Sequence, residues 1–174
     1  MIPQLTVLSL LCLLAGGAAA ADVNIALTGR LLAASCDITP GSAEQPVHIG
    51  DFSASTFTAV GSVTAFKAFN INLTGCSQGI TGARVAFTGD SDADDPALLA
   101  LSDTSGSGGM AAGVGVELLD NSLTPLAVNT APVQVYPLAE GSNTLSFLLR
   151  YRATRVPVTP GNASAVMYFD LTYQ

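Results

Sequence analysis

The sequence predicts an all-β protein, an antiparallel β-sandwich, and three observations carry that prediction. Short apolar segments follow one another along the chain, each bounded by Gly, Pro, Asn, Asp or Ser residues. Several of them alternate apolar and polar residues with the period of two that a half-buried strand requires. Only two cysteines lie beyond the first 20 residues, which fits a sandwich held by one disulfide.

Eight segments are expected to be strands. They are residues 23–32, 47–52, 68–75, 83–88, 113–119, 133–137, 143–153 and 163–173. Alternation is clearest at 69–73, at 145–151, and in the last segment, where one face carries Ala165, Met167, Phe169, Leu171 and Tyr173. A turn is expected at 159–161 and a short helix at 96–101. The last strand runs to the end of the given sequence, so its exposed edge is expected to be covered either by the first strand of the same sandwich or by a strand of another chain.

Residues 1–20 are typical of a secretory signal peptide. They contain no charged side chain, have an apolar centre at 5–15 and end in small residues that fit a cleavage site before Ala21 or Asp22. The basic residues that normally precede such a centre are absent, so a misassigned start codon or an uncleaved anchor are alternatives. Cleavage before Ala21 leaves 174 − 20 = 154 residues, the size of one domain with a real core.

Cysteine content and charge restrict the possible functions. Cys12 leaves with the leader, and Cys36 and Cys76 remain in an exported chain, where one disulfide is the default. A disulfide between them would close a loop of about 40 residues, which contributes about 4 kcal/mol to stability in the entropic account. The net charge of −7 argues against nucleic acid and anionic membranes as partners.

Candidate catalytic and metal motifs are weak. The run at 90–95, DSDADD, begins like a calcium loop but has Asp95 where glycine is needed and Leu101 where glutamate is needed. The glycine-rich stretch at 105–113 has no Lys-Ser/Thr pair, so it is interpreted as a flexible connection and not as a phosphate cradle. His48 is the one histidine, and no nucleophile elbow accompanies it. We therefore expect neither an enzyme nor a bound metal or cofactor.

Eight short motifs follow one another over the 154 mature residues. They are VNIALTG at 23–29, Cys36 and Cys76, VAFTGDSD at 85–92, ALLALS at 97–102, GVGVELLD at 113–120, NTLSFLLRYRAT at 143–154, VTPGNASA at 158–165 and FDLTYQ at 169–174. In the order of these motifs the chain resembles the chaperone–usher pilins, the subunits of type 1 and P fimbriae of Gram-negative bacteria. Gly161 and Tyr173 stand where the terminal motif of the family has glycine and tyrosine.

The resemblance implies an incomplete immunoglobulin-like β-sandwich, a six-strand pilin fold that lacks its last strand. The expected domains are a signal peptide at 1–20, an N-terminal donor-strand extension at 21–30 and a pilin domain at 31–174. The extension would fill the groove of a neighbouring subunit through Val23, Ile25 and Leu27, with Gly29 at the point where the groove has no room for a side chain.

The resemblance also implies that this chain accepts a strand from another subunit. The chain's own acceptor groove, which also contacts the chaperone, would be formed by Leu31, Met167, Phe169, Leu171, Tyr173 and Gln174. A periplasmic chaperone would lend a strand and bind the C-terminal carboxylate before an outer-membrane usher and neighbouring pilins take over. The product would be a fimbrium on the cell surface that supports adhesion.

The position of the subunit in the fibre is a separate question. ATRVPVT at 153–159 and the short N-terminal extension favour a minor adaptor subunit of the fibre tip, and the major rod pilin is the alternative. A sugar-binding secreted β-sandwich adhesin is a further alternative, but the mature chain has no room for an extra lectin domain and contains no tryptophan to stack on sugar.

Overall fold

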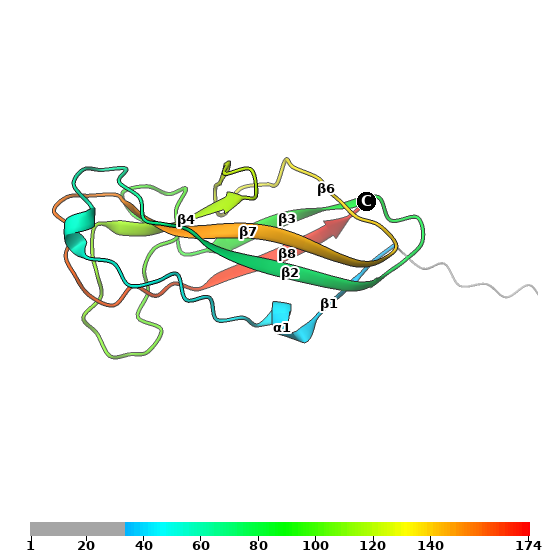
Figure 1. The fold of residues 1–174 in the computed structure, drawn as a ribbon, viewed down its shortest axis with the longest axis horizontal. Coiled ribbons are helices and arrows are strands. Elements are labelled where there is room, and N and C mark those ends of the chain that lie inside the picture. The colour runs from blue at the N-terminus through cyan, green and yellow to red at the C-terminus, as the bar shows by residue number, and fades with distance from the viewer. Residues whose placement is uncertain (1–33) are drawn as a thin grey trace, which may run out of the picture. The chain divides into compact units, whose positions relative to one another are not determined.

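The computed structural model describes residues 34–174. The expectations for the leader, for the N-terminal extension, for the strand at 23–32 and for Leu31 lie outside the described residues. From Ala34 onward the chain forms two antiparallel sheets, which confirms the all-β class and the sandwich (Figure 1). No helix in this part of the chain has the length and hydropathy that a membrane span needs.

The larger sheet has five strands in the order β1-β2-β7-β4-β5, and the smaller has three in the order β6-β3-β8. The five are β1 (Asp37–Ile38), β2 (Lys67–Cys76), β7 (Gly141–Ala153), β4 (Val114–Asp120) and β5 (Pro125–Leu126). The three are β6 (Tyr136–Pro137), β3 (Gly82–Gly89) and β8 (Met167–Tyr173). Two short helical turns, α1 (Pro40–Ala43) and η1 (Ala54–Thr56), interrupt the segment between β1 and β2.

Alternating side chains of the long strands build the core between the sheets. In β2 and β7 the apolar residues of one face are buried, as the period-two pattern predicts. The ring of Phe147 lies at the centre, with ring centroids of Phe69, Phe87 and Tyr136 at 5.6, 4.9 and 5.4 Å. Each fully buried side chain of this size contributes about 1.5–3 kcal/mol to folding. Aromatic packing therefore joins the two sheets.

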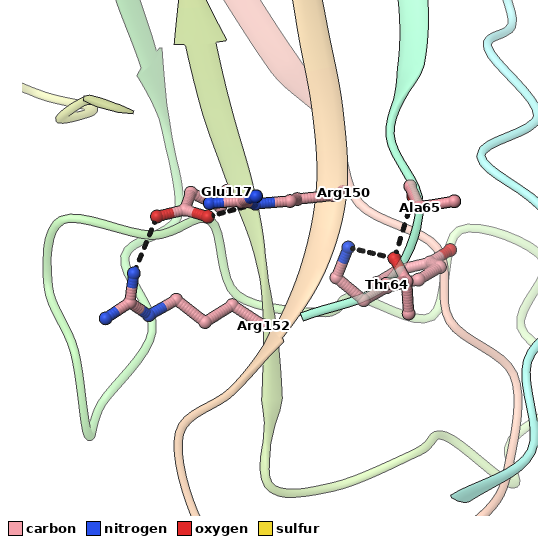
Figure 2. A network of polar contacts seen from close by, with 6 residues as sticks. Thr64, Ala65, Glu117, Arg150 and Arg152 are labelled. Atoms are coloured by element: carbon pink, nitrogen blue, oxygen red, sulfur yellow. Dashed lines mark hydrogen bonds and ion pairs between the residues drawn. The ribbon is translucent and has the colours of Figure 1, made fainter. Parts of the chain in front are cut away.

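A buried carboxylate connects β4 to β7. Glu117 on β4 is almost completely buried, and its two oxygens accept hydrogen bonds from Arg150 Nε at 2.5 Å and Arg152 Nη1 at 2.8 Å. Figure 2 shows the carboxylate held between the two guanidinium groups of β7. Beside them the Thr64 hydroxyl accepts the amide of Tyr151 at 3.1 Å and donates to the carbonyl of Ala65 at 3.0 Å. Because Glu117 has two cationic partners, its burial does not leave an isolated charge.

The disulfide joins the start of the described chain to the end of β2. Cys36 and Cys76 are bonded across a sequence separation of 40 residues, as expected. The bond lies beside β1, whose Asp37 and Ile38 pair with Thr74 and Leu73 of β2.

The helix expected at 96–101 is wrong. Residues 96–98 form turns, and Leu99 makes a bridge to Val116 through backbone hydrogen bonds of 3.0 and 2.9 Å. The backbone N–H and C=O of Leu99, which a helix would have bonded within itself, are therefore bonded to the edge of β4. Burial of Leu98 and Leu99 then holds the segment on the sandwich.

Three expected strands differ in extent. The segment 47–52 is not a strand: it has no regular secondary structure and pairs with no strand of the described chain. The segment 133–137 is a strand only at Tyr136–Pro137. The last strand begins at Met167 and not at residue 163, because Ser164 bonds to Ser102 through its backbone oxygen at 2.7 Å and its hydroxyl at 2.7 Å. The bonds to Ser102 replace pairing with β3, which ends opposite Met167.

Candidate functional site

The last strand has one unpaired edge. Along its full length β8 pairs with β3, and within the described chain no strand pairs with its other side. A row of backbone N–H and C=O groups on that side is therefore available to an added strand. The side chains of β8 alternate between half-buried and exposed, as the sequence predicts, so one face of the strand points into the sandwich.

A groove of about 350 Å³ runs beside this free edge. Met167 and Phe169 form one wall, and the floor includes Phe69 and Leu149 of the opposite sheet. The second wall comes from the end of β1 and from the chain between β1 and η1, namely Ile38, Ser42, Ala43, Gln45, Val47 and Ile49. The inward residues of β8 pack on the core but stay only partly buried, because no strand covers them on this side. The apolar interior of the sandwich is thus open beside the first part of β8, at residues 167–169.

A second hollow of about 310 Å³ lies where the chain approaches β8. Its walls are Phe52 and Phe57 on one side and the segment 158–163 on the other, with Tyr151 between them. The Tyr151 hydroxyl donates to the carbonyl of Ala163 at 2.6 Å. Burial, and secondarily the negative charge of Asp51, raise the pKa of this phenol, so it remains a neutral donor. This bond fixes the segment that leads into β8.

Gly161 sits at a close approach of two backbones beside the second hollow. A Cβ built at this position would lie 2.5 Å from the backbone nitrogen of Ala111, in a contact with the main chain at 109–111 that no real Cβ makes. The adjoining Asn162 and Thr159 pair with Met110 and Ala112. Glycine at position 161 therefore allows the segment 158–163 to lie against the glycine-rich loop and form a wall of the hollow.

The far end of β8 is tied to the disulfide region. The Tyr173 hydroxyl donates to the carbonyl of Cys36 at 3.1 Å. Burial is the largest cause of the raised pKa of Tyr173, with a smaller contribution from Asp37, while the bond to Cys36 opposes it. The Gln174 backbone oxygen accepts from the Thr81 amide at 2.8 Å and the Thr81 hydroxyl at 3.0 Å. These contacts hold the last two residues against the turn before β3.

The structure brings only part of the expected site together. Met167 and Phe169 line the groove, and Leu171 and Tyr173 continue the same face of β8. The sequence-based analysis missed the opposite wall, above all Val47 and Ile49. The sequence predicts an ordinary strand at 47–52 and does not place these two residues in the groove. Residues Phe52, Phe57 and Tyr151 were missed because no local pattern connects them to β8.

The polar clusters considered in the sequence serve local structure. His48 Nε2 lies 3.8 Å from Asp51 Oδ2 in an exposed pair. The Asp92 carboxylate accepts the amides of Asp94 and Asp95, which forms a turn. In residues 34–174 no three His, Cys, Asp or Glu side chains gather as they would around a metal ion.

Comparison with known proteins agrees with this architecture. Residues 25–174 match the family described as "Fimbrial protein". An "Uncharacterized fimbrial-like protein YcbU" of Escherichia coli K12 is 44% identical over 167 residues, covering 95% of this chain and 92% of the relative. A "Fimbrial subunit type 1" of Salmonella typhimurium is 40% identical over 153 residues, covering 87% of this chain and 82% of the relative.

A solved structure has the same fold. The crystal structure of "the P pilus rod subunit PapA" superposes with a TM-score of 0.67 at 26% identity, covering 80% of this chain and 99% of that one. The chain therefore belongs to the fimbrial protein family and is a pilin, a structural subunit of the chaperone–usher class and not an enzyme.

Proposed function

We propose that this pilin polymerises by donor-strand exchange, accepting a strand in the groove beside β8 and donating its own residues 21–30. The observation that carries the proposal is the unpaired edge of β8 over an open apolar groove. An added strand would complete both the hydrogen-bond ladder and the hydrophobic core. This mode of binding takes affinity from the backbone and register from alternate side chains.

The N-terminal extension has the length and pattern of such a strand. Val23, Ile25 and Leu27 alternate with small or polar residues and are followed by Gly29. From Val23 to Gly29 is seven residues, the length of β8. Three buried aliphatic side chains contribute about 1.5–3 kcal/mol each. Each ladder hydrogen bond adds about 1 kcal/mol, and the loss of chain freedom opposes these terms.

The remaining assignments follow from the same proposal. Residues 1–20 are removed as a signal peptide, 21–30 are the donor strand and 31–174 form the pilin domain, with Leu31 joining β8 in lining the groove. A periplasmic chaperone covers the groove and binds the carboxylate of Gln174, and an outer-membrane usher passes the subunit to neighbouring pilins. The completed fimbrium is displayed on the cell surface and supports adhesion.

Two substitutions and a deletion test the exchange. Deleting residues 22–29 should give a chaperone-bound subunit that accepts a neighbour but cannot insert into one. Gly29→Leu should block insertion by steric clash, whereas Thr28→Leu, on the opposite face of the strand, should be tolerated. The measurement is the rate at which each variant displaces the chaperone from an unsubstituted subunit. Incorporation of the deleted protein into polymers at the normal rate would refute the proposal.

For the position in the fibre we propose the adaptor role, supported by residues 153–159 and by the short extension. The rod is the second candidate, favoured by the similarity to a type 1 fimbrial subunit and to the rod subunit PapA. Immunogold labelling of intact fimbriae separates the two. Label confined to the tips supports the adaptor, and label along the shaft supports the rod.

A further inference from the structure

The three-stranded sheet has a second edge, and this edge lies on β3. On one side β8 pairs with β3 from Ala83 to Gly89, whereas on the other side β6 pairs with it only at Gly82 and Ala83. Within the described chain, residues 84–89 therefore have no strand on this second side. An uncovered strand edge is a template for pairing with another chain. Pairing there would compete with strand addition at β8.

The backbone groups that face the second edge follow from the ladder to β8. In an antiparallel pair, only every second residue exchanges hydrogen bonds with its neighbour. The Gln174 amide donates to the Gly82 carbonyl at 2.8 Å, so Gly82 and every second residue after it face β8. The residues whose N–H and C=O groups point to the second edge are therefore Val85, Phe87 and Gly89.

Asn129 occupies this edge in place of a strand. Its backbone amide donates to the Phe87 carbonyl at 2.8 Å. Its side chain bonds both backbone groups of Gly89, because Oδ1 accepts the Gly89 amide at 3.2 Å and Nδ2 donates to the Gly89 carbonyl at 2.8 Å. One exposed asparagine thus uses the groups that a paired strand would bond at the end of β3.

The loop that carries Asn129 is fixed on the sandwich. The preceding Val128 is buried, and its amide donates to the Ala97 carbonyl at 3.3 Å. Asn129 has a φ of 57°, in the left-handed region that asparagine adopts more readily than most residues with a side chain. Its Nδ2 also donates to the Ser91 hydroxyl at 2.9 Å. These contacts hold the amide group against Gly89.

The rest of the second edge is short. Between β6 and Asn129 it runs from Val85 to Phe87 and borders a hollow of about 300 Å³. The other walls of this hollow are Tyr136 and residues 124–127 and 130–134. Strands of globular proteins are usually about 3–10 residues long, so the stretch that remains is at the lower limit for pairing.

We infer that Asn129 is a specificity-determining residue of polymerisation, because it closes the second edge of β3 and so confines strand addition to β8. Without its side chain, β3 of one copy would pair through this edge with β3 of a second copy. The inference rests on the proposed function for the addition at β8 and extends it to an edge outside the groove.

The test compares three variants of the mature subunit in complex with the chaperone, which covers β8 in the proposed assembly. Asn129→Gly removes the side chain but keeps the positive φ at no steric cost. Leu123→Gly is the matched control, since Leu123 is exposed, has a φ of 64° and bonds through its amide to Asp120. Asn129→Asp loses the same donated bonds as Asn129→Gly but leaves a charge on the edge, which opposes pairing.

Sedimentation over a range of concentrations measures self-association of each complex, and circular dichroism verifies folding. Hydrogen exchange of the amides of Val85, Phe87 and Gly89 locates the contact. Pairing at the second edge protects these amides in the associated species, whereas a loosened loop leaves them exposed.

We expect the Asn129→Gly complex to self-associate about tenfold more tightly than the unsubstituted complex, the factor that one or two backbone hydrogen bonds supply. Exchange at the three amides should slow on association. Leu123→Gly and Asn129→Asp should behave like the unsubstituted chain. Unchanged association of Asn129→Gly would overturn the inference, and so would an equal increase in either of the other variants.

Failure of the proposed function gives a different result. The unsubstituted chain would then not co-purify with the chaperone. In that case the same three variants are compared as free mature chains, by the same sedimentation and exchange measurements and with the same expected order.

Discussion

The phenol of Tyr173 donates a hydrogen bond to the carbonyl oxygen of Cys36 at 3.1 Å, and so connects the penultimate residue to the disulfide across 137 positions of sequence. Cys36 is covalently bonded to Cys76 at the end of β2. The edge strand β8 is thereby fixed to the other sheet at the end where the chain joins the sandwich. The end of β8 is thus anchored to both sheets, and such preorganisation lowers the cost of binding an added strand.

Two substitutions of Tyr173 should destabilise this end of β8 to different extents. Tyr173→Phe removes the bond to Cys36 and should lower the free energy of unfolding by about 1 kcal/mol. Tyr173→Ser also removes the half-buried ring and should weaken capture by the chaperone. Co-purification with the chaperone measures capture, and urea denaturation measures stability. Equal capture of the unsubstituted protein and Tyr173→Ser would show that the ring is not needed.

Gly161→Ala should destabilise the fold because its Cβ would collide with the main chain of the 109–111 segment. Overpacking against a backbone that cannot withdraw costs about 1–3 kcal/mol. Gly41→Ala is the control, since a Cβ at Gly41 meets no atom within 4 Å. Guanidinium denaturation should show a lower midpoint for Gly161→Ala only. A midpoint equal to that of Gly41→Ala would mean that the two segments separate at little cost.

Glu117 should matter more to stability than any exposed acidic residue of this sandwich. Glu117→Gln keeps the shape of the side chain but removes the charge shared by Arg150 and Arg152, and should cost about 1–3 kcal/mol, less than for a fully buried pair because both arginines reach solvent. Asp94→Asn is the control, since its pair with Arg155 is exposed, and should cost under about 0.5 kcal/mol. Thermal unfolding of both variants measures the difference. Equal losses of stability in the two variants would contradict the prediction that the ion pairs of Glu117 stabilise the sandwich.

Tyr136 should make the fold sensitive to alkaline pH. Burial, with a smaller contribution from the charge of Asp120, raises the pKa of Tyr136 from 10.0 to about 12. Folding thus favours the protonated phenol, and this contribution is complete below pH 10 and is lost as pH rises from 10 toward 12. The free energy of unfolding should fall over this interval, and Tyr136→Phe should remove part of the fall. An identical pH dependence in Tyr136→Phe would exclude this origin.

The sequence by itself predicted the strands whose pattern is local. In β2, β7 and β8 the inward residues are those that the period-two alternation selected, because successive side chains of a strand point to opposite faces whatever its neighbours are. The pairing of Cys36 with Cys76 was likewise the default once a single pair remained in an exported chain.

The tertiary structure determined the features that depend on contacts between segments distant in sequence. Val47 and Ile49 were expected in a strand, yet they line a groove, and no described strand pairs with them. Leu99 has a helix-compatible context but bridges to Val116, since the edge of β4 supplies backbone partners there. The contacts of Gly161 with the 109–111 segment and of Glu117 with two arginines join residues distant in sequence. Local periodicity specifies the face of each strand, but only the packed sandwich determines which edge stays unpaired.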